Sequence, residues 1–422
     1  MFVLAPDQSV DNPDRSVDTA EVGGLAVSPH TAAVRRLDNG ALAALEVQLR
    51  GPADGPLATP EALRTVARAM NEKRELDHLT WDVAGTVAAD GVPVLVSIDL
   101  DSLPGLENRA ADPECQRREI VVVTAAIFTA DPSRALRAVA DARGRGRLIA
   151  VDDVGTHPAA IALLSLIEPD IILLAPVMIT RRPDSDIART AHAVAARVES
   201  SGAVVVATGV GTEVQRRRAL SLGATYGVGE HLEDIESAPA SWPASATVEP
   251  FPPTPTWNTP DHDSRSPHAI ASSGRTAVRS LKRLLVTMST TLETHAAAAG
   301  PETLVLGTFQ RAEHFTDRTR TRWQNMASRI AYAGVYGVGM GHTVDEGIHQ
   351  APLAADDELV EEWNVVVLGP HFGCVLSAVD LHRGEADSER EFDYVVSYDR
   401  STVVRCARAV LDRFTADPSS AG

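Results

Sequence analysis

Two adjacent carboxylates stand at the end of an apolar run, where Asp152 and Asp153 follow Leu148-Ile149-Ala150-Val151. Oxygen ligands at the carboxyl end of a buried strand are typical of barrel enzymes that hold divalent metals. Glu46 and Asp99 also fall at the ends of apolar runs, so all four carboxylates are candidates for one rim. Two hard cations held there would serve hydrolysis of a phosphodiester. The number of oxygen ligands at the other strand ends therefore decides between an enzyme and a binding or regulatory protein.

The first half of the chain alternates short apolar runs with amphipathic segments, which predicts the elements that carry these carboxylates. The runs expected as strands are 43–49, 92–99, 120–125, 147–152, 170–174, 203–208 and a weak 225–229. The segments expected as helices are 60–71, 132–142, 158–167, 184–199 and 213–222. Nearly continuous apolar strands separated by helices indicate a parallel sheet covered on both faces. Seven or eight such units in roughly 220 residues favour an α/β fold, a closed TIM-like (β/α)8 barrel.

A proline-rich segment separates this block from a second, smaller one. Seven prolines fall between Pro239 and Pro260, among small and polar residues with little apolar periodicity. Such a composition indicates an extended linker. The expected organisation is a tail over 1–19, a barrel over 20–237, the linker over 238–267, a second domain over 268–416 and a tail over 417–422.

The second block predicts an α+β domain with a mainly antiparallel sheet flanked by helices. Its expected helices are 274–298, 316–333 and 401–414. Its expected strands are 303–308, 334–339, 364–369, 374–380 and 392–398. Neither block shows an internal repeat.

The composition of the 422 residues argues against several classes of protein. With 39 basic and 57 acidic residues the net charge is −18, which argues against nucleic acid as a partner. Cys115, Cys374 and Cys406 show no metal or redox spacing. The N-terminus lacks an export signal, and no window approaches the ~20 apolar residues of a membrane span. We therefore expect a soluble, cytoplasmic protein without a membrane span.

Four motifs in the first block occur in the order of a known family. They are Leu45-Glu46-Val47-Gln48-Leu49-Arg50-Gly51-Pro52, the run 149–156 with the double aspartate, Pro169-Asp170-Ile171-Ile172-Leu173, and Ala207-Thr208-Gly209-Val210-Gly211-Thr212. Through them, residues 20–235 resemble the EAL family of cyclic di-GMP phosphodiesterases. The resemblance implies a barrel of EAL type, cyclic di-GMP as ligand, and hydrolysis through two ions of Mg or Mn.

The resemblance also implies roles for individual residues. Glu46, Asp152 and Asp153 are retained as metal ligands, and Arg50 as a phosphate contact. The chain departs from the family at six positions, with Ser97 for an asparagine, Val122 for a glutamate, Leu173 for a lysine, Thr208 and Gly211 for two glutamates, and Val228 for a glutamine. Because Leu173 and Thr208 replace catalytic positions, we expect no catalytic residues and an inactive, degenerate barrel.

Alternatives stay open for the retained residues. Asp99 and His157 could join Glu46, Asp152 and Asp153 in a rearranged site for one Mg or Mn ion. The aspartate pair could instead cap the following helix and hold its loop. A guanidinium binds phosphate without any metal. The barrel could therefore still bind cyclic di-GMP or another nucleotide through Arg50.

The second block resembles another family through residues 364–374 and 392–400. This family is the DICT domain, a presumed sensory module, and the resemblance covers about residues 270–415. His371, Tyr398, Asp399 and Arg400 are candidates for a sensor pocket. Asp399 and Arg400 could instead cap and begin the last helix.

Three functional hypotheses follow from these resemblances. The leading one is a cytoplasmic regulatory protein of cyclic di-GMP signalling, in which an inactive barrel binds a small nucleotide or a protein partner and communicates with the sensor through the linker. The second is a cyclic di-GMP phosphodiesterase that uses Glu46, Asp99, Asp152 and Asp153 with Mg or Mn. The third is a scaffold that binds neither nucleotide nor metal. A homodimer formed through the barrel stays open in each case.

Overall fold

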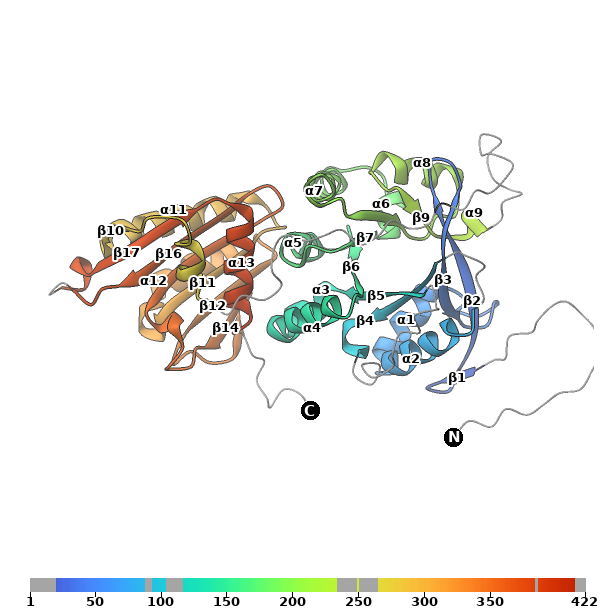
Figure 1. Cartoon of the computed structure of the whole chain (residues 1–422), viewed down its shortest axis with the longest axis horizontal. Helices are drawn as coiled ribbons and strands as arrows, with labels where there is room; N and C mark the ends of the chain where they lie inside the picture. The colour runs from blue at the N-terminus through green and yellow to red at the C-terminus, as the bar shows by residue number, and fades with distance from the viewer. Residues whose placement is uncertain are drawn as a thin grey trace, which may run out of the picture.

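The computed structural model describes residues 20–87, 93–103, 117–233, 249, 265–383 and 386–413. Two domains lie side by side in it, with the barrel at one end of the molecule and a sheet-rich domain at the other (Figure 1). Within these residues, no helix combines the length and apolar content needed to cross a bilayer.

The first domain is a closed barrel, which confirms the predicted fold class. Its strands are β2 (Leu25–Arg36), β3 (Leu42–Arg50), β4 (Val94–Asp99), β5 (Arg117–Val123), β6 (Leu148–Val154), β7 (Ile171–Leu174), β8 (Val204–Ala207) and β9 (Tyr226–Gly227). They follow one another in chain order, and β2 pairs with β9 to close the ring. The pairs from β3 to β9 are parallel, whereas β2 is antiparallel to both of its neighbours. A short β1 (Ala20–Val22) pairs with β2 outside the ring.

Helices cover the outside of the barrel. They are α1 (Pro60–Ala69), α2 (Lys73–Ala84), α3 (Ala125–Ala130), α4 (Pro132–Gly144), α5 (Pro158–Ile167), α6 (Pro176–Thr180), α7 (Ser185–Ser201), α8 (Glu213–Ser221) and α9 (Glu230–Glu233). Several begin at a polar side chain that accepts a backbone N–H, such as Thr59, Asp131, Asp184 and Thr212. Helix α5 is buried on every face after its first residue, which explains its unbroken apolar sequence.

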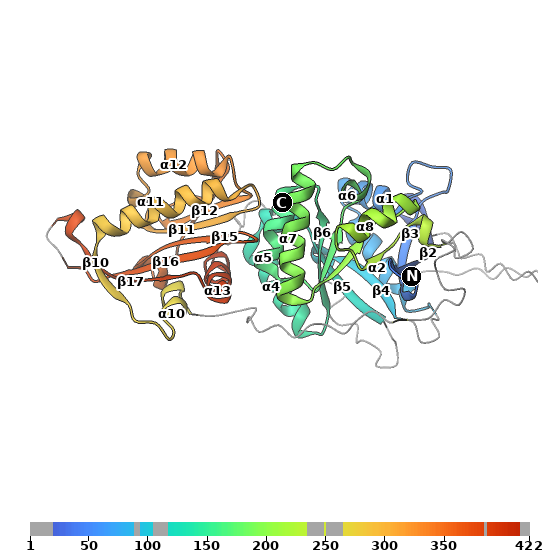
Figure 2. The same cartoon turned by 90° about the horizontal axis from the view of Figure 1, so that it is seen from above.

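The second domain is an eight-stranded sheet between two pairs of helices. The strand order is β10-β17-β16-β15-β11-β12-β14-β13. The strands are β10 (Val278–Leu281), β11 (Leu304–Arg311), β12 (Tyr332–Val338), β13 (Thr343–Asp345), β14 (Ile348–Pro352), β15 (Glu362–Leu368), β16 (Gly373–Asp380) and β17 (Glu391–Ser397). All pairs are antiparallel except those of β12 with β11 and β14. Helices α11 (Lys282–Ala299) and α12 (Asp317–Ala327) cover one face, and α10 (Pro267–Ala271) and α13 (Arg400–Leu411) the other (Figure 2).

Two helix predictions for the second domain extended too far. The helix expected over 274–298 begins only at Lys282, because 278–281 pairs with β17 as an edge strand. Val278 and Leu281 are three residues apart, a spacing that suits a helix, but pairing with the sheet prevails. The helix expected over 316–333 ends at Ala327, and β12 begins five residues later.

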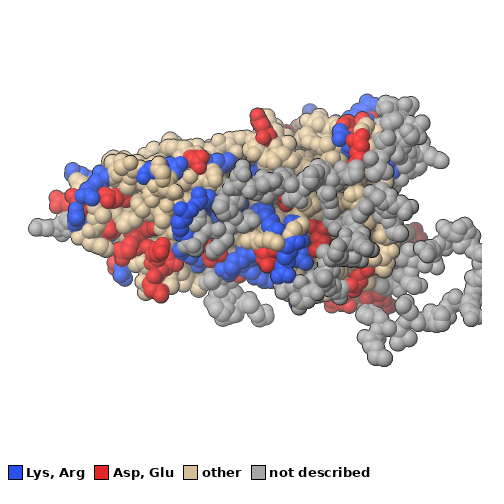
Figure 3. Space-filling view, in the orientation of Figure 1, with Lys and Arg blue, Asp and Glu red and all other residues tan. Residues whose placement is uncertain are grey.

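The two domains contact each other directly. Arg408 of α13 donates from Nε to the carbonyl oxygen of Leu166 at the end of α5, over 3.0 Å. Phe128 of α3 packs edge-on against Tyr332 of β12, with ring centroids 6.0 Å apart. Buried apolar residues of both domains form one continuous cluster. Basic side chains gather on the surface over this junction (Figure 3). Contact between the domains therefore does not depend on the linker alone.

Most of the expected linker lies outside the described residues. Glu249 is an exception, because its backbone N–H donates to the carbonyl oxygen of Leu42 over 3.0 Å. Its carboxylate also contacts Arg36, at 3.2 Å. The segment therefore touches the barrel at this point, near the turn between β2 and β3.

Candidate functional site

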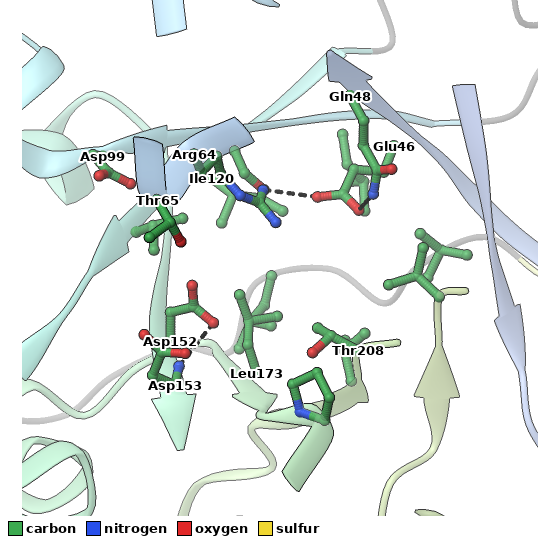
Figure 4. Close-up of a pocket in the computed structure, with 18 of the residues that line it drawn as sticks. Glu46, Gln48, Arg64, Thr65, Asp99, Ile120, Asp152, Asp153, Leu173 and Thr208 are labelled. Carbon is green, nitrogen blue, oxygen red and sulfur yellow. Dashed lines mark hydrogen bonds between the residues drawn. The ribbon is translucent and has the colours of Figure 1, made fainter. Parts of the chain in front are cut away.

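A pocket of about 130 Å³ opens at the rim where the barrel strands end. The four predicted carboxylates all line it: Glu46, Asp99, Asp152 and Asp153. Three basic residues that the sequence analysis did not consider also line it: Arg64, Arg68 and Lys73. Glu46 and Gln48 lie on one side of the pocket and the aspartate pair on the other (Figure 4). The carboxylates are thus brought together, but beside an almost equal number of cations.

Glu46 is already hydrogen-bonded at both carboxylate oxygens. Ser97, which stands at the family's asparagine position, donates from Oγ to Oε1 over 3.1 Å. Gln48 donates from Nε2 to Oε2 over 2.8 Å. These two bonds hold the carboxylate against the barrel wall. A metal ion would have to compete with these two hydrogen bonds for the lone pairs of the Glu46 carboxylate.

Asp99 is held by two cations. Arg68 donates from Nε to Oδ2 over 2.9 Å, and the ammonium of Lys73 lies 3.3 Å from Oδ1. Burial raises the pKa of Asp99, but Lys73 and Arg68 outweigh burial and bring the pKa below its ordinary value. Both cations come from the helices that follow β3, so this carboxylate ties α1 and α2 to β4. An ion pair of this kind leaves little capacity for a divalent metal.

Asp152 and Asp153 lie near the end of β6, where its pairing with β7 is irregular between Val151 and Val154. The backbone N–H of Asp153 donates to Oδ1 of Asp152 over 2.8 Å, and Asp153 has a left-handed φ of 57°. Burial raises the pKa of Asp152, and the neighbouring charge of Asp153 raises it further. The next helix is capped by His157, whose Nδ1 accepts from the N–H of Ala159 over 3.1 Å. The cap expected from the aspartate pair is therefore supplied by His157.

The side of the pocket where the family places its other charged residues is apolar. Val122 lies in β5, Leu173 lies in β7, and Val228 follows β9. Thr208 is polar, but its hydroxyl donates to the carbonyl oxygen of Leu174 over 2.9 Å. No proton-transfer group stands at any of these four positions.

A second, larger cavity of about 580 Å³ adjoins the first and shares Gln48 and Val228 with it. Arg50 lies on its wall, together with His30. Glycines supply much of the remaining surface: Gly51, Gly209, Gly211 and Gly229. The N–H groups of Gly51 and Gly211 already donate, to the carbonyl oxygen of Leu57 over 2.8 Å and to Oε1 of Gln215 over 2.7 Å, so these glycines give a ligand room beside the backbone and not free donors. This cavity has the size of a small-molecule site, and its one carboxylate is Glu230.

The donor set does not fit a two-metal centre. Two dications about 4 Å apart repel by roughly 16 kcal/mol at an effective dielectric of 20, so several uncommitted carboxylates must surround them. Here Glu46 is bonded at both oxygens and Asp99 is paired with two cations. Among the described residues, no group of three or more His, Cys, Asp or Glu side chains is arranged to hold a metal ion.

The residues expected in a sensor pocket have other contacts. Asp399 caps α13, accepting from the N–H of Thr402 over 2.9 Å. Arg400 donates to the carbonyl oxygen of Gly369 over 3.1 Å and to the Ser165 hydroxyl of the barrel over 2.7 Å. Tyr398 is 64% exposed and His371 is also exposed. The cap interpretation of Asp399 thus matches its geometry, and Arg400 belongs to the contact between the domains.

Comparison with known families agrees with both resemblances. Residues 27–234 match the model of the EAL domain. Residues 268–381 match the model described as "Sensory domain in DIguanylate Cyclases and Two-component system", named DICT. The chain joins an EAL domain to a DICT domain. This combination indicates a role in cyclic di-GMP signalling.

Solved structures similar to the chain are EAL domains. A phosphodiesterase named PaMucR, in complex with c-di-GMP, is 22% identical, with a TM-score of 0.40 over 49% of this chain and 91% of that one. The FimX EAL domain of Xanthomonas citri, also with c-diGMP, is 17% identical, with a TM-score of 0.35 over 48% and 85% of the two chains. No curated protein matches the chain.

The basic residues around the EAL pocket were missed from the sequence, although a signal was present. Arg64 and Arg68 are four residues apart in a segment expected as a helix, so both lie on one helix face. That face lies toward the carboxyl ends of the strands, where Arg68 meets Asp99. The motifs that predict ligands all lie at strand ends, whereas these arginines lie on a helix.

Proposed function

We propose that this protein is a regulator of cyclic di-GMP signalling whose EAL domain binds the dinucleotide without hydrolysing it. The observation that carries the proposal is the pairing of the retained carboxylates beside an apolar wall. Glu46 and Asp99 are committed to neighbouring side chains, and Leu173 stands at the family's lysine position. These pairings and the leucine at position 173 support binding without hydrolysis, because two-metal hydrolysis requires free carboxylates and a group that positions water.

Binding is supported by the larger cavity. A guanidinium offers several donors to a phosphate, and Arg50 lies on the wall of a cavity of about 580 Å³. The glycine backbone of Gly51, Gly209 and Gly211 lines the same space. A phosphate beside Arg50 and a base extending toward Gln48 would use the two adjoining cavities together. Because α13 contacts α5 directly, ligand binding in the barrel would affect the DICT domain through this interface.

Calorimetry with cyclic di-GMP tests the proposal, with and without Mn, on the wild type, on Arg50→Ala and on Arg145→Ala. Arg145 lies at the opposite end of the barrel, after α4, and serves as the matched loss of an arginine. We expect metal-independent binding that Arg50→Ala weakens about tenfold or more, as for a charged hydrogen bond. We expect Arg145→Ala to bind as the wild type does.

A hydrolysis assay on the same samples tests the second half of the proposal. Turnover of cyclic di-GMP with Mg or Mn that is lost on Asp152→Ala would show an active phosphodiesterase and overturn it. Absence of both binding and turnover would favour the scaffold hypothesis instead.

A further inference from the structure

The DICT domain contains a cavity of about 470 Å³ between its sheet and the helices α11 and α12. It lies far along the molecule from the EAL pockets and shares no residue with them. Its size falls within the range of small-molecule sites. None of the residues expected in a sensor pocket lines it. It is therefore a second candidate site, independent of the proposal for the EAL domain.

Three aromatic side chains line one side of this cavity: Phe309, Trp363 and Phe392. Trp363 and Phe392 meet edge to face, with ring centroids 6.1 Å apart. Phe309 is fixed by Phe315, at 4.9 Å between centroids. Phe309 and Phe392 are only 8% and 1% exposed, so the half-buried ring of Trp363 offers most of the aromatic surface to a flat ligand.

A hydrogen-bond acceptor accompanies the rings, whereas the indole N–H of Trp363 is closed off from the cavity. The indole N–H of Trp363 is buried and makes no hydrogen bond within the part of the chain that the structure describes. His314 lies 3.1 Å from the carbonyl oxygen of Phe309 through Nδ1. Because a carbonyl can only accept, Nδ1 carries the proton, and Nε2 of the neutral ring is an acceptor. Burial lowers the pKa of His314, which favours this neutral form.

An irregular strand shapes the cavity wall. The register of β11 with β12 shifts between Thr308 and Arg311, so that Phe309 and Gln310 are carried on a bulge. Gln310 has a left-handed φ of 59°, which is costly for a residue with a side chain. Bulges of this kind re-aim side chains and are frequent beside functional sites. Both bulge residues line the cavity.

The charges around the cavity are balanced. Its basic residues Lys282, Arg318 and Arg322 are matched in number by Glu293, Glu313 and Asp387. Two of these oppositely charged pairs form salt bridges. Lys282 lies 2.6 Å from Asp387, and Arg322 lies 2.9 Å from Glu293. A strongly anionic ligand such as a dinucleotide would find no net positive charge here. The balanced charge of the cavity therefore favours a neutral ligand.

We infer that this cavity binds a neutral, planar nitrogen heterocycle. Its ring packs on Trp363 beside Phe309 and Phe392, and a ring N–H donates to His314. Purine and pteridine ring systems have this chemistry. The bound ring would lie between the sheet and α11, and would fix the position of that helix on the sheet.

Calorimetry of the full chain with lumazine, a pteridine that carries ring N–H and carbonyl groups, tests the inference. Thr290 of α11 lines the cavity and is half-buried, whereas its neighbour Thr291 is exposed and does not line it. We expect wild type to bind lumazine with a Kd below about 1 mM. Thr290→Trp, which fills the cavity, should abolish binding, and Thr291→Trp should retain it.

Two further measurements separate ring packing from hydrogen bonding. His314→Phe keeps an aromatic ring but removes the acceptor Nε2, so affinity should fall about tenfold. Glutarimide keeps the imide edge without an aromatic ring and should not bind. Circular dichroism and thermal melting confirm that each variant is folded.

The inference is overturned if lumazine and hypoxanthine both fail to bind folded wild type below about 1 mM. It is equally overturned if binding persists in Thr290→Trp, or if glutarimide binds as well as lumazine. Arg50→Ala should leave lumazine binding unchanged, and Thr290→Trp should leave cyclic di-GMP binding unchanged. The two proposals can therefore fail separately.

Discussion

Arg408 of the DICT domain lies 3.3 Å from the carboxylate of Glu168 in the EAL domain, and both side chains are buried. Glu168 ends α5 with a left-handed φ of 55° and also pairs with Arg197 at 3.2 Å. One carboxylate therefore joins α7 of the barrel to α13 of the DICT domain. We therefore expect the stability of each domain to depend on this contact.

Replacing Arg408 should uncouple the domains. Arg408→Ala removes the pair with Glu168 and the hydrogen bond to Leu166, and we expect it to lower the free energy of unfolding by about 1–3 kcal/mol. Denaturant unfolding should then resolve two transitions where the wild type shows one. The control is Arg413→Ala, because Arg413 pairs with Asp357 at 2.9 Å within the DICT domain. Equal behaviour of the two variants would contradict the role of Arg408.

Replacing Asp99 should destabilise the EAL domain. Asp99→Asn leaves Lys73 and Arg68 beside a neutral side chain, and breaking a buried ion pair costs about 3–5 kcal/mol. Since the folded pKa of Asp99 is lowered, its contribution is present above the unfolded pKa of about 3.9 and is lost as pH falls through the folded pKa. The variant should therefore show a smaller loss of stability on acidification. Asp38→Asn, which breaks an exposed pair with Arg36, should cost less than about 1 kcal/mol.

Replacing Asp152 should have the opposite effect on stability. Burial and Asp153 raise the folded pKa of Asp152, so its ionisation costs stability once pH exceeds the unfolded value of about 3.9. Asp152→Asn should therefore raise the melting temperature at neutral pH, and the gain should vanish near pH ~3. Asp54→Asn, in an exposed loop, is the control. A melting temperature that fell at neutral pH would show that Asp152 is stabilised by its surroundings.

Replacing Gly229 should deform the larger EAL cavity. It has a φ of 151°, and a Cβ there would lie 2.3 Å from the backbone nitrogen of Val210. Gly229→Ala should lower the free energy of unfolding by about 1–3 kcal/mol and weaken cyclic di-GMP binding. Gly223 also has a positive φ, of 86°, but nothing lies within 4 Å of its Cβ position. If Gly223→Ala were as harmful to binding, the effect would come from stability and not from the cavity.

The periodicity of the sequence was sufficient for most of the barrel. Strands β3 to β9 and helices α1, α4, α5, α7 and α8 follow from apolar runs and caps, since these are local signals. Strand β2 was missed although it closes the ring. Its twelve residues include Pro29 and His30 within a polar stretch, and only pairing with β3 and β9 makes it a strand.

The candidate site was harder to predict than the fold. The carboxylates were found because motifs place them at strand ends. Their partners, such as Lys73 for Asp99, come from helix α2, which was not predicted. Likewise Arg400 was considered for a pocket, whereas it donates to Ser165 of the other domain. Contacts between distant segments leave no periodic trace in the sequence.

The shared core of the two domains lies within one chain, so their contact through α5 and α13 is intramolecular. Covalent linkage gives each domain a high effective concentration near the other, so even a weak interface stays mostly closed. A ligand in either domain then needs to supply only a small differential affinity to change the fraction of open molecules. The equilibrium between closed and open molecules is intramolecular, so it should not depend on protein concentration.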